Sequence, residues 1–356
     1  MPTQLAAERS VGSAELVHAF PEQMPTGVTV ADDGRIFVCY PRWGDPVQFT
    51  VAEVRDAEEV AYPDARFNVF DEQRPADCLV SVQSVVVDPA GRLWLLDTGS
   101  TEFGPTKPDG PKLVGVDLAT DEVVQTIRFP TDVVLETTYL NDIRFDLRRG
   151  AAGAAFITDS SLTGPSGIIV VDLDSGRSWR KLHDHPSTRP VDGFIAIIEG
   201  RPLAGLRVSA DGIAISADGE RLYYCPLSSR RLYSASVDAL NDERAGDDAV
   251  AATVEDHGEK GASDGLESDA DGRVYASNYE QGAILVRQPG GEWDALVHRS
   301  DLLFVDTLSV AADGFIYYTV NQVHRQPAFQ GGTDLRERPY ALMRTPIDGE
   351  PVRLAP

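Results

Sequence analysis

Polar residues occupy one equivalent position in six repeated segments of the chain, directly before the first apolar run of each. Carboxylates gathered at close range raise one another's pKa unless a positive charge compensates them. Asn141, Asp211 and Asp264 therefore predict a site for a hard cation such as Ca²⁺ or for a cationic group of a substrate. The open alternative is that an Asp before Gly only shapes a turn and that water fills the site. The full set at this position is Thr26, Gln83, Asn141, Asp211, Asp264 and Asp306.

A second set of polar residues follows the same segments, where each one ends. Residues with exchangeable protons on loops held by a rigid scaffold suit a small polar substrate. We expect His324 or Glu280 to act as general acid or base, and Arg42 to donate hydrogen bonds to a developing oxyanion. Any of these residues could equally cap a strand end. The substrate-binding candidates are Asp97, Asp159, Asn278, Tyr279 and Asn321, together with Gln83 and Asp306 from the first set.

The repeated segments that carry these residues have the pattern of β-hairpins. Each pairs a short run of alternating apolar residues with an aromatic-rich run across a turn of the Asp-x-x-Gly or Asp-Gly type. Gly and Asp tolerate the backbone conformations that tight turns require. The six hairpins are expected at residues 27–40, 84–97, 142–159, 212–225, 265–278 and 307–320.

Further strand-like pieces between the hairpins complete units of four strands. Six such units predict an all-β fold, a six-bladed β-propeller forming one domain over residues 1–356. We expect residues 15–20 to close the ring as a strand of the final blade. Residues 51–59 are expected to form a short helix or an excursion between blades. The alternative of two stacked β-sandwiches would place a linker at residues 183–190.

Composition narrows the possible partners. The chain has 356 residues, and 32 Lys and Arg against 56 Asp and Glu give a net charge of −24. Such a surface repels nucleic acid and anionic lipid, and no apolar run approaches the ~20 residues of a membrane span. The N-terminus lacks the pattern of a secretory signal, and the three cysteines show no metal or disulfide spacing, so we expect a cytoplasmic protein with a small-molecule substrate.

Several stretches resemble the Yellow and major royal jelly protein family. They include residues 37–54 with Pro-Arg-Trp, residues 79–99 with Arg-Leu-Trp-Leu-Leu-Asp-Thr-Gly, and residues 155–180 ending in Ser-Trp-Arg. The resemblance implies a six-bladed propeller, and some family members are linked to conversion of dopachrome, an oxidised catechol. Animal members are usually secreted and carry a Cys where this chain has Ala90, a difference that fits a reducing compartment.

A more distant resemblance connects the chain to gluconolactonase and senescence-marker propellers. In those proteins a Glu and several Asn or Asp residues at the start of inner strands hold a divalent metal. Asn141, Asp211 and Asp264 match the ligands of the third, fourth and fifth blades, whereas Thr26 and Gly27 stand at the position of the first-blade Glu. This resemblance implies Ca²⁺ as a possible cofactor of three side chains and water.

Together these observations predict an isomerase or tautomerase of small-molecule or secondary metabolism. Its substrate would be enolisable, with an aromatic compound as one possibility, and would bind at the mouth of the central channel. Two alternatives are a metal-dependent lactonase and a propeller that binds a small ligand without turnover.

Overall fold

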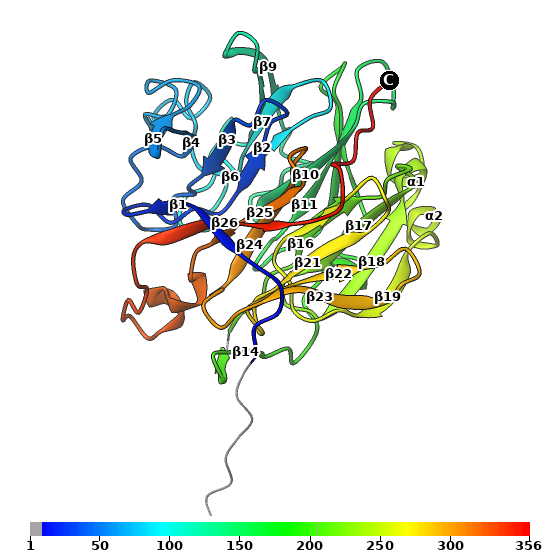
Figure 1. Cartoon of the computed structure of the whole chain (residues 1–356). Helices are drawn as coiled ribbons and strands as arrows, with labels where there is room; N and C mark the ends of the chain where they lie inside the picture. Colours follow the sequence, from blue (N-terminus) through cyan, green and yellow to red (C-terminus); the bar gives the residue numbers. More distant parts are fainter. Residues whose placement is uncertain (1–8, 204) are drawn as a thin grey trace, which may run out of the picture.

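The computed structural model describes residues 9–203 and 205–356. Almost every regular element is a β-strand, and the strands form six antiparallel sheets of four. The first strand of each sheet contacts the first strands of the two neighbouring sheets, and the last sheet contacts the first in the same way. The sheets are therefore the blades of a closed six-bladed β-propeller, as the repeats predict (Figure 1).

The first three blades follow one another along the chain. Blade 1 contains β2 (Val28–Val30), β3 (Ile36–Cys39), β4 (Val51–Arg55) and β5 (Glu58–Ala61). Blade 2 contains β6 (Val82–Val87), β7 (Arg92–Asp97), β8 (Lys112–Asp117) and β9 (Glu122–Arg128). Blade 3 contains β10 (Leu140–Asp146), β11 (Ala154–Asp159), β12 (Gly167–Asp172) and β13 (Ser178–Lys181).

The remaining blades repeat this order. Blade 4 contains β16 (Ala210–Ile215), β17 (Arg221–Pro226), β18 (Arg231–Ser236) and β19 (Glu255–Glu259). Blade 5 contains β20 (Leu266–Ser268), β21 (Val274–Asn278), β22 (Ala283–Arg287) and β23 (Trp293–His298). Blade 6 contains β24 (Val305–Val310), β25 (Phe315–Val320), β26 (Tyr340–Pro346) and β1 (Glu15–Phe20).

Strand β1 closes the ring. It pairs antiparallel with β26, from Glu15 opposite Arg344 to Phe20 opposite Tyr340. The predicted closure by residues 15–20 is confirmed. The expectation for residues 51–59 is wrong, because β4 and β5 occupy this segment as the two outer strands of blade 1. Arg55 and Glu58 pair at the end of that hairpin, where Asp56 and Ala57 both have a positive φ.

The hairpin turns explain the repeated sequence pattern. In blade 2, Oδ1 of Asp88 accepts hydrogen bonds from the backbone N–H groups of Ala90 and Arg92, and Gly91 takes a φ of +77°. Oδ2 of Asp88 accepts a hydrogen bond from Nε1 of the buried Trp94 at 2.7 Å. One carboxylate thus fixes both the turn and an aromatic side chain of the core.

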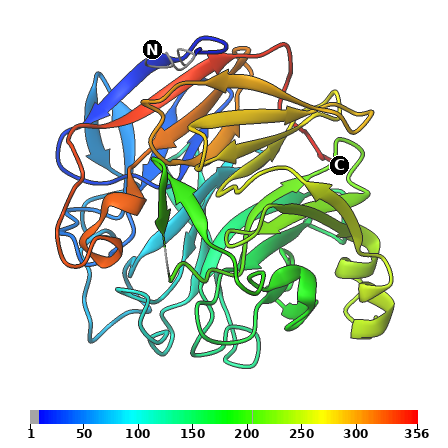
Figure 2. The ribbon, with the colours of Figure 1, turned by 90° about the horizontal axis from the view of Figure 1, so that it is seen from below.

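Short elements outside the blades gather at one face of the ring. They are the 3-10 helix η1 (Pro186–Thr188), the hairpin of β14 (Ala196–Ile198) and β15 (Arg201–Leu203), and the 3-10 helices η2 (Val323–Arg325) and η3 (Pro327–Phe329). Seen from this face, the hairpin lies near the middle of the ring, with η2 and η3 beside it (Figure 2). The helices α1 (Val237–Asn241) and α2 (Asp247–Ala251) connect the outer strands of blade 4.

Candidate functional site

A pocket opens on the propeller axis at the face where the inner strands begin. We call it the axial pocket; it encloses about 560 Å³, counted to its open mouth. The pocket is lined by five of the six residues that the repeat places before the inner strands. It brings together side chains up to 223 positions apart in sequence, from Gln83 to Asp306. Its lining consists of Trp43, Gln83, Phe103, Tyr139, Asn141, Ser160, Leu206, Val208, Asp211, Leu227, Asp264, Phe304, Asp306, Val323, Gln326 and Phe329.

Three of these residues, Asp211, Asp264 and Asp306, are the axial acids. Each is at least nine-tenths buried. Burial is the main cause that raises the pKa of Asp211 to about 7 and the pKa of Asp306 to about 8. Burial, followed by the charges of Asp306 and Asp211, raises the pKa of Asp264 well above its ordinary value. Near neutral pH the pocket therefore holds carboxyl groups in both protonation states.

Hydrogen bonds distribute the proton among the axial acids. Interaction between the side chains of Asp264 and Asp211 lowers the pKa of Asp211 and raises that of Asp264. Asp211 also accepts a bond from Oγ of Ser160 at 3.0 Å. Asp306 accepts one from Nδ2 of the buried Asn321 at 2.6 Å. A carboxylic acid beside a carboxylate is an arrangement suited to general acid–base chemistry.

The arginine of the inner strand β10 does not neutralise these acids. Arg144, on the inner strand β10, is paired with Asp142 at 3.0 Å and with Glu267 at 3.2 Å. Both partners are carboxylates outside the axial pocket lining. The positive charge of Arg144 is thus neutralised by Asp142 and Glu267. No Lys or Arg is among the residues that line the axial pocket.

The residues predicted to hold Ca²⁺ lie together, yet they do not form a preformed cation site. Hydrogen bonding to Asn141 and Asp264 lowers the pKa of Asp211, so the three side chains lie within reach of one another. At the first-blade position, Oγ1 of the fully buried Thr26 contacts the carbonyl of Gln83. Among the described residues, no group of three or more His, Cys, Asp or Glu side chains is arranged to hold a metal ion.

Aromatic side chains form the wall above the acids. The indole of Trp43 stacks on Phe103 with ring centroids 5.0 Å apart, and Phe103 lies 4.9 Å from Tyr139. The hydroxyl of Tyr139 accepts a bond from Nε1 of Trp43 and donates to Oε1 of Gln83. On another part of the wall Phe304 stacks on Tyr279 at 4.9 Å. This lining favours a flat, largely apolar ligand over the polar floor.

Two of the three predicted catalytic residues anchor the hairpin of β14 and β15. His324 contacts Glu199 in the turn of this hairpin, and burial lowers the pKa of the His324 imidazole. Glu280 accepts a bond from the backbone N–H of Ile197 on β14 and pairs with Arg230. Neither side chain is among those that line the axial pocket.

The third predicted catalytic residue, Arg42, is also engaged in the scaffold. Its guanidinium donates to the backbone carbonyls of Val80, Val47 and Asn68. These bonds hold together the loops at the end of blade 1, and Arg42 does not line the axial pocket. The neighbouring residue, Trp43, does line the axial pocket.

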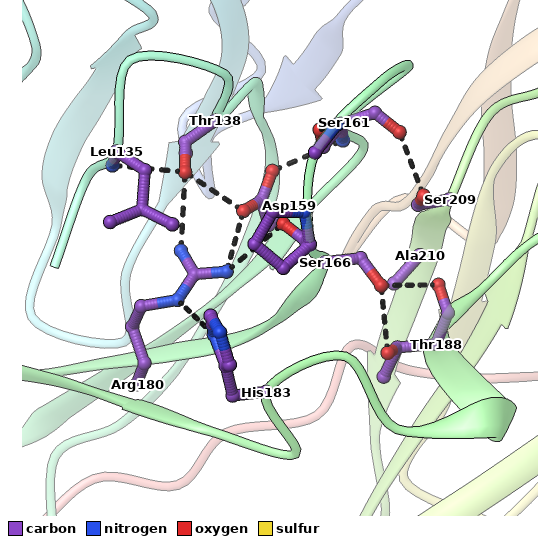
Figure 3. Close-up of polar contacts among 12 residues, drawn as sticks. Leu135, Thr138, Asp159, Ser161, Ser166, Arg180, His183, Thr188, Ser209 and Ala210 are labelled. Carbon is purple, nitrogen blue, oxygen red and sulfur yellow. Dashed lines mark hydrogen bonds and ion pairs between the residues drawn. The ribbon is translucent and has the colours of Figure 1, made fainter.

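The remaining predicted substrate-binding residues have buried protein partners. Asp97 pairs with Lys112 at 2.8 Å and accepts bonds from three backbone N–H groups. Asp159 pairs with Arg180 at 2.8 Å and accepts from Thr138, in a network in which Arg180 also contacts His183 (Figure 3). Oδ1 of Asn278 accepts a bond from the backbone of Gln281. These contacts secure strand ends.

Sequence reasoning did not identify the aromatic wall or the hairpin beside it. The wall residues Trp43 and Phe103 lie in the loops after β3 and β7, whereas Tyr139 and Phe304 each lie two positions before the repeat residues Asn141 and Asp306. Phe103 and Phe304 adopt a positive φ of +54° and +64°, which is uncommon for bulky residues and is concentrated at functional sites. The Pro-Arg-Trp element gave a signal through Trp43. The position two residues before Asn141 and Asp306 gave a second signal, for Tyr139 and Phe304, that the sequence interpretation did not use.

Comparison with known proteins matches this architecture. The family model for major royal jelly protein matches residues 80–348. The chain belongs to the major royal jelly protein family. Within this family, Protein yellow of Drosophila subobscura is 27% identical over 70% of this chain and 45% of its own length, and Protein yellow of Drosophila melanogaster is 29% identical over 64% and 43%. The chain thus spans less than half the length of these curated relatives.

Solved structures share the fold of this family member at low sequence identity. A calcium-binding protein, regucalcin, from Agrobacterium tumefaciens has a TM-score of 0.59 and 15% identity, covering 96% of this chain and 97% of that one. A gluconolactonase from Xanthomonas campestris has a TM-score of 0.54 and 13% identity, with coverages of 96% and 98%. These similarities establish the propeller fold. No helix among the described residues is long and apolar enough to cross a membrane.

Proposed function

We propose that this protein is an isomerase or tautomerase that moves a proton on a small, enolisable aromatic molecule bound in the axial pocket. The observation that carries the proposal is the combination of three buried carboxyl groups with raised pKa values and an aromatic wall above them. Enzymes obtain general acids and bases at neutral pH by this kind of burial.

The axial acids supply both halves of a keto–enol interconversion. The carboxyl group of Asp264 or Asp306 donates its proton to the substrate carbonyl oxygen, while the carboxylate of Asp211 removes a proton from the adjacent carbon. The electron pair of the broken C–H bond forms the C=C bond of the enol. The enol is itself the tautomer, and the proton of its hydroxyl group comes from the carboxyl group that donated it. Where a second C=C bond is conjugated with the enol, return of the carbon-bound proton from Asp211 to the γ-carbon, with return of the hydroxyl proton to the donating carboxylate, gives the isomer. In this proposal the axial acids take the proton-transfer role predicted for His324 and Glu280.

The pocket also restricts the charge of its ligand. Its lining contains three acidic residues and no Lys or Arg, so an anionic substrate would meet repulsion in a weakly screened site. A neutral carbonyl compound avoids this cost. The proposed substrate is therefore a neutral aromatic ketone that carries a hydrogen on the carbon next to its carbonyl group.

The same charge pattern favours a second candidate, binding of an aromatic cation without turnover. A positively charged group beside Asp211 and Asp264 would return both to the carboxylate form and would release the proton that they share. The aromatic wall would then hold the ring of the ligand. This candidate differs from the first in a measurable way, because it predicts proton release on binding and no exchange of ligand protons.

Three earlier expectations stay predictions beside this proposal. The metal-dependent lactonase requires Ca²⁺ at Asn141, Asp211 and Asp264, and we route no step through this ion because no group of three or more His, Cys, Asp or Glu side chains among the described residues is arranged to hold a metal. The cytoplasmic location and the preference for a small molecule over nucleic acid or membrane follow from sequence patterns alone.

Exchange of ligand protons with solvent tests the proposal. Phenylacetone, a neutral aryl ketone, is incubated with protein in D₂O, and NMR follows deuterium incorporation at its α-carbons. We expect exchange with the wild-type protein and with the control Asp132→Asn, which changes an exposed carboxylate outside the pocket, but not with Asp211→Asn, which removes the proposed base. Binding of a cationic aryl amine without exchange would favour the second candidate. If the protein neither exchanges the α-protons of phenylacetone nor binds the cationic aryl amine, both candidates are refuted.

A further inference from the structure

A second pocket adjoins the axial pocket. We call it the outer pocket; it encloses about 740 Å³, counted to its open mouth. Two aromatic residues, Phe103 and Tyr139, line both pockets and therefore form the partition between them. The outer pocket is lined by Phe103, Gly104, Pro105, Glu136, Thr137, Thr138, Tyr139, Leu162 and Thr163.

The ring of Phe103 is the accessible part of this partition. Tyr139 is only 5% exposed and is fixed by hydrogen bonds to Trp43 and Gln83, whereas Phe103 is 42% exposed. The loop holds Phe103 in the left-handed backbone region at a φ of +54°. This conformation is unfavourable for a bulky residue, and here it places the ring between Trp43 and Tyr139.

The outer pocket has a different chemical character from the axial pocket. Thr137, Thr163 and Glu136 are exposed and offer two hydroxyls and one carboxylate, while Pro105 and Leu162 supply apolar surface. No Lys or Arg is present in its lining. A hydroxylated, neutral chain fits these groups, whereas a carboxylate or phosphate would approach Glu136 without a compensating cation.

We propose that the outer pocket is a second subsite, which binds a neutral polar side chain of the substrate while its aromatic head occupies the axial pocket. The substrate is then a ring compound with a hydroxylated tail that passes over Phe103. This inference rests on the proposed function, because it takes the aromatic head in the axial pocket as its starting point. Phe103 becomes a specificity-determining residue for tail length.

Calorimetric titration with three matched probes tests the subsite. Phenol reports the axial pocket alone, para-hydroxyphenylpropanol adds a neutral tail, and para-hydroxyphenylpropanoate ends the same tail in a carboxylate. We expect the alcohol to bind at least about tenfold tighter than phenol, since its three methylene groups and hydroxyl gain new contacts. We expect the carboxylate to bind about tenfold more weakly than the alcohol, and Glu136→Gln to narrow that gap to about threefold.

Variants of Phe103 separate the ring from the backbone conformation. Phe103→Ala and Phe103→Gly both remove the ring, but only Gly accepts the left-handed φ without strain. We expect both variants to weaken phenol binding by about fivefold. We also expect them to reduce the affinity that a ligand loses when its tail is bulkier. Glu102→Gly is the matched control, because Glu102 has the same φ of +54° and lines neither pocket. It should leave all three affinities unchanged.

The outcomes distinguish this inference from the function beneath it. If phenol binds but the neutral tail adds no affinity, or if Glu136→Gln leaves the discrimination against the carboxylate unchanged, the outer subsite is refuted and the axial pocket stands. If no probe binds, the aromatic head itself is refuted, and the proposed function falls together with the subsite.

Discussion

Nε2 of His324 lies 2.9 Å from Oε2 of Glu199, and this contact joins the loop between β25 and β26 of blade 6 to the turn of the hairpin between blades 3 and 4. Arg325 adds a second bond to the same carboxylate at 2.6 Å. Apolar residues of the hairpin, Ala196 and Ile198, pack in one cluster with the pocket residue Phe304. The His324 contact therefore secures a neighbour of the axial pocket wall.

Loss of this anchor should loosen the hairpin of β14 and β15. In Glu199→Gln the amide cannot pair with Arg325 as a carboxylate does, so we expect faster backbone hydrogen exchange in residues 195–203. Mass spectrometry of deuterated peptides measures it. Asp192→Asn, an exposed change earlier in the same connection, serves as control. Equal exchange in wild type and Glu199→Gln would contradict an anchoring role.

Acidification should release the same anchor. The hydrogen bond from Arg325 is the main cause that lowers the pKa of Glu199 to about 2, against burial, which raises it. A carboxyl group with a lowered folded pKa contributes stability that is present above its ordinary pKa near 4.5 and is lost as the pH falls toward 2. Hydrogen exchange of residues 195–203, corrected for intrinsic rates, should therefore rise below pH 4. A pH-independent corrected rate would contradict this prediction.

Asn321 should act as a positioning residue for Asp306. Its hydrogen bond lowers the pKa of Asp306, which burial and the charge of Asp211 raise. In Asn321→Ala the pKa of Asp306 should rise further, and the alkaline limb of the pH profile for α-proton exchange should move to higher pH. Asn321→Asp also removes the hydrogen-bond donor, and it tests whether the alkaline limb again moves to higher pH. A loss of rate at every pH without a shift would indicate a structural effect only.

The axial acids should make the protein less stable as the pH rises. The pKa of Asp211 is about 7 in the folded protein and near 3.8 in the unfolded chain, so the folded state binds more protons between these values. The free energy of unfolding then falls through this window, by at most about 1.4 kcal/mol per pH unit for this group. Asp211→Asn should flatten the decline in denaturant titrations at pH 5 and pH 8. Parallel pH curves for both proteins would contradict the raised pKa.

Metal removal should leave proton exchange intact, because no proposed step uses an ion. EDTA-treated protein is expected to exchange the α-protons of phenylacetone at the untreated rate, measured by NMR. Loss of exchange that Ca²⁺ restores, together with calcium binding that Asp264→Asn abolishes, would instead support the metal site and the lactonase alternative.

The fold was predictable because the blades repeat. Alternating apolar runs and the turns at Asp88 and its equivalents are local signals, and they locate the hairpins. The closing strand also followed, since the last unit lacked a fourth strand. The error at residues 51–59 arose because Glu53, Arg55 and Glu58 gave this outer pair a polar pattern that hides its strands.

The site was predictable only in part. The repeat position identifies Asp211, Asp264 and Asp306 because equivalent residues of a propeller meet at the axis. For the loops no such rule exists: Asp97 and Asp159 are of the same residue type as the axial acids, yet each is neutralised by a basic partner, Lys112 or Arg180, that sequence separation conceals. The wall formed by Trp43, Phe103 and Tyr139 depends on loop conformations that only the three-dimensional structure supplies.

The pairing of β1 with β26 also means that β1 stays unpaired during most of the synthesis of the chain. Residues 15–20 leave the ribosome before every other strand among the described residues, whereas their partner strand at residues 340–346 follows more than 300 residues later. At typical elongation rates the β1 edge waits on the order of tens of seconds without its partner. During that interval the nascent chain exposes unpaired backbone groups and the apolar side chain of Phe20. Chaperones recognise such surfaces, and on closely spaced ribosomes the same surfaces would favour aggregation between nascent chains.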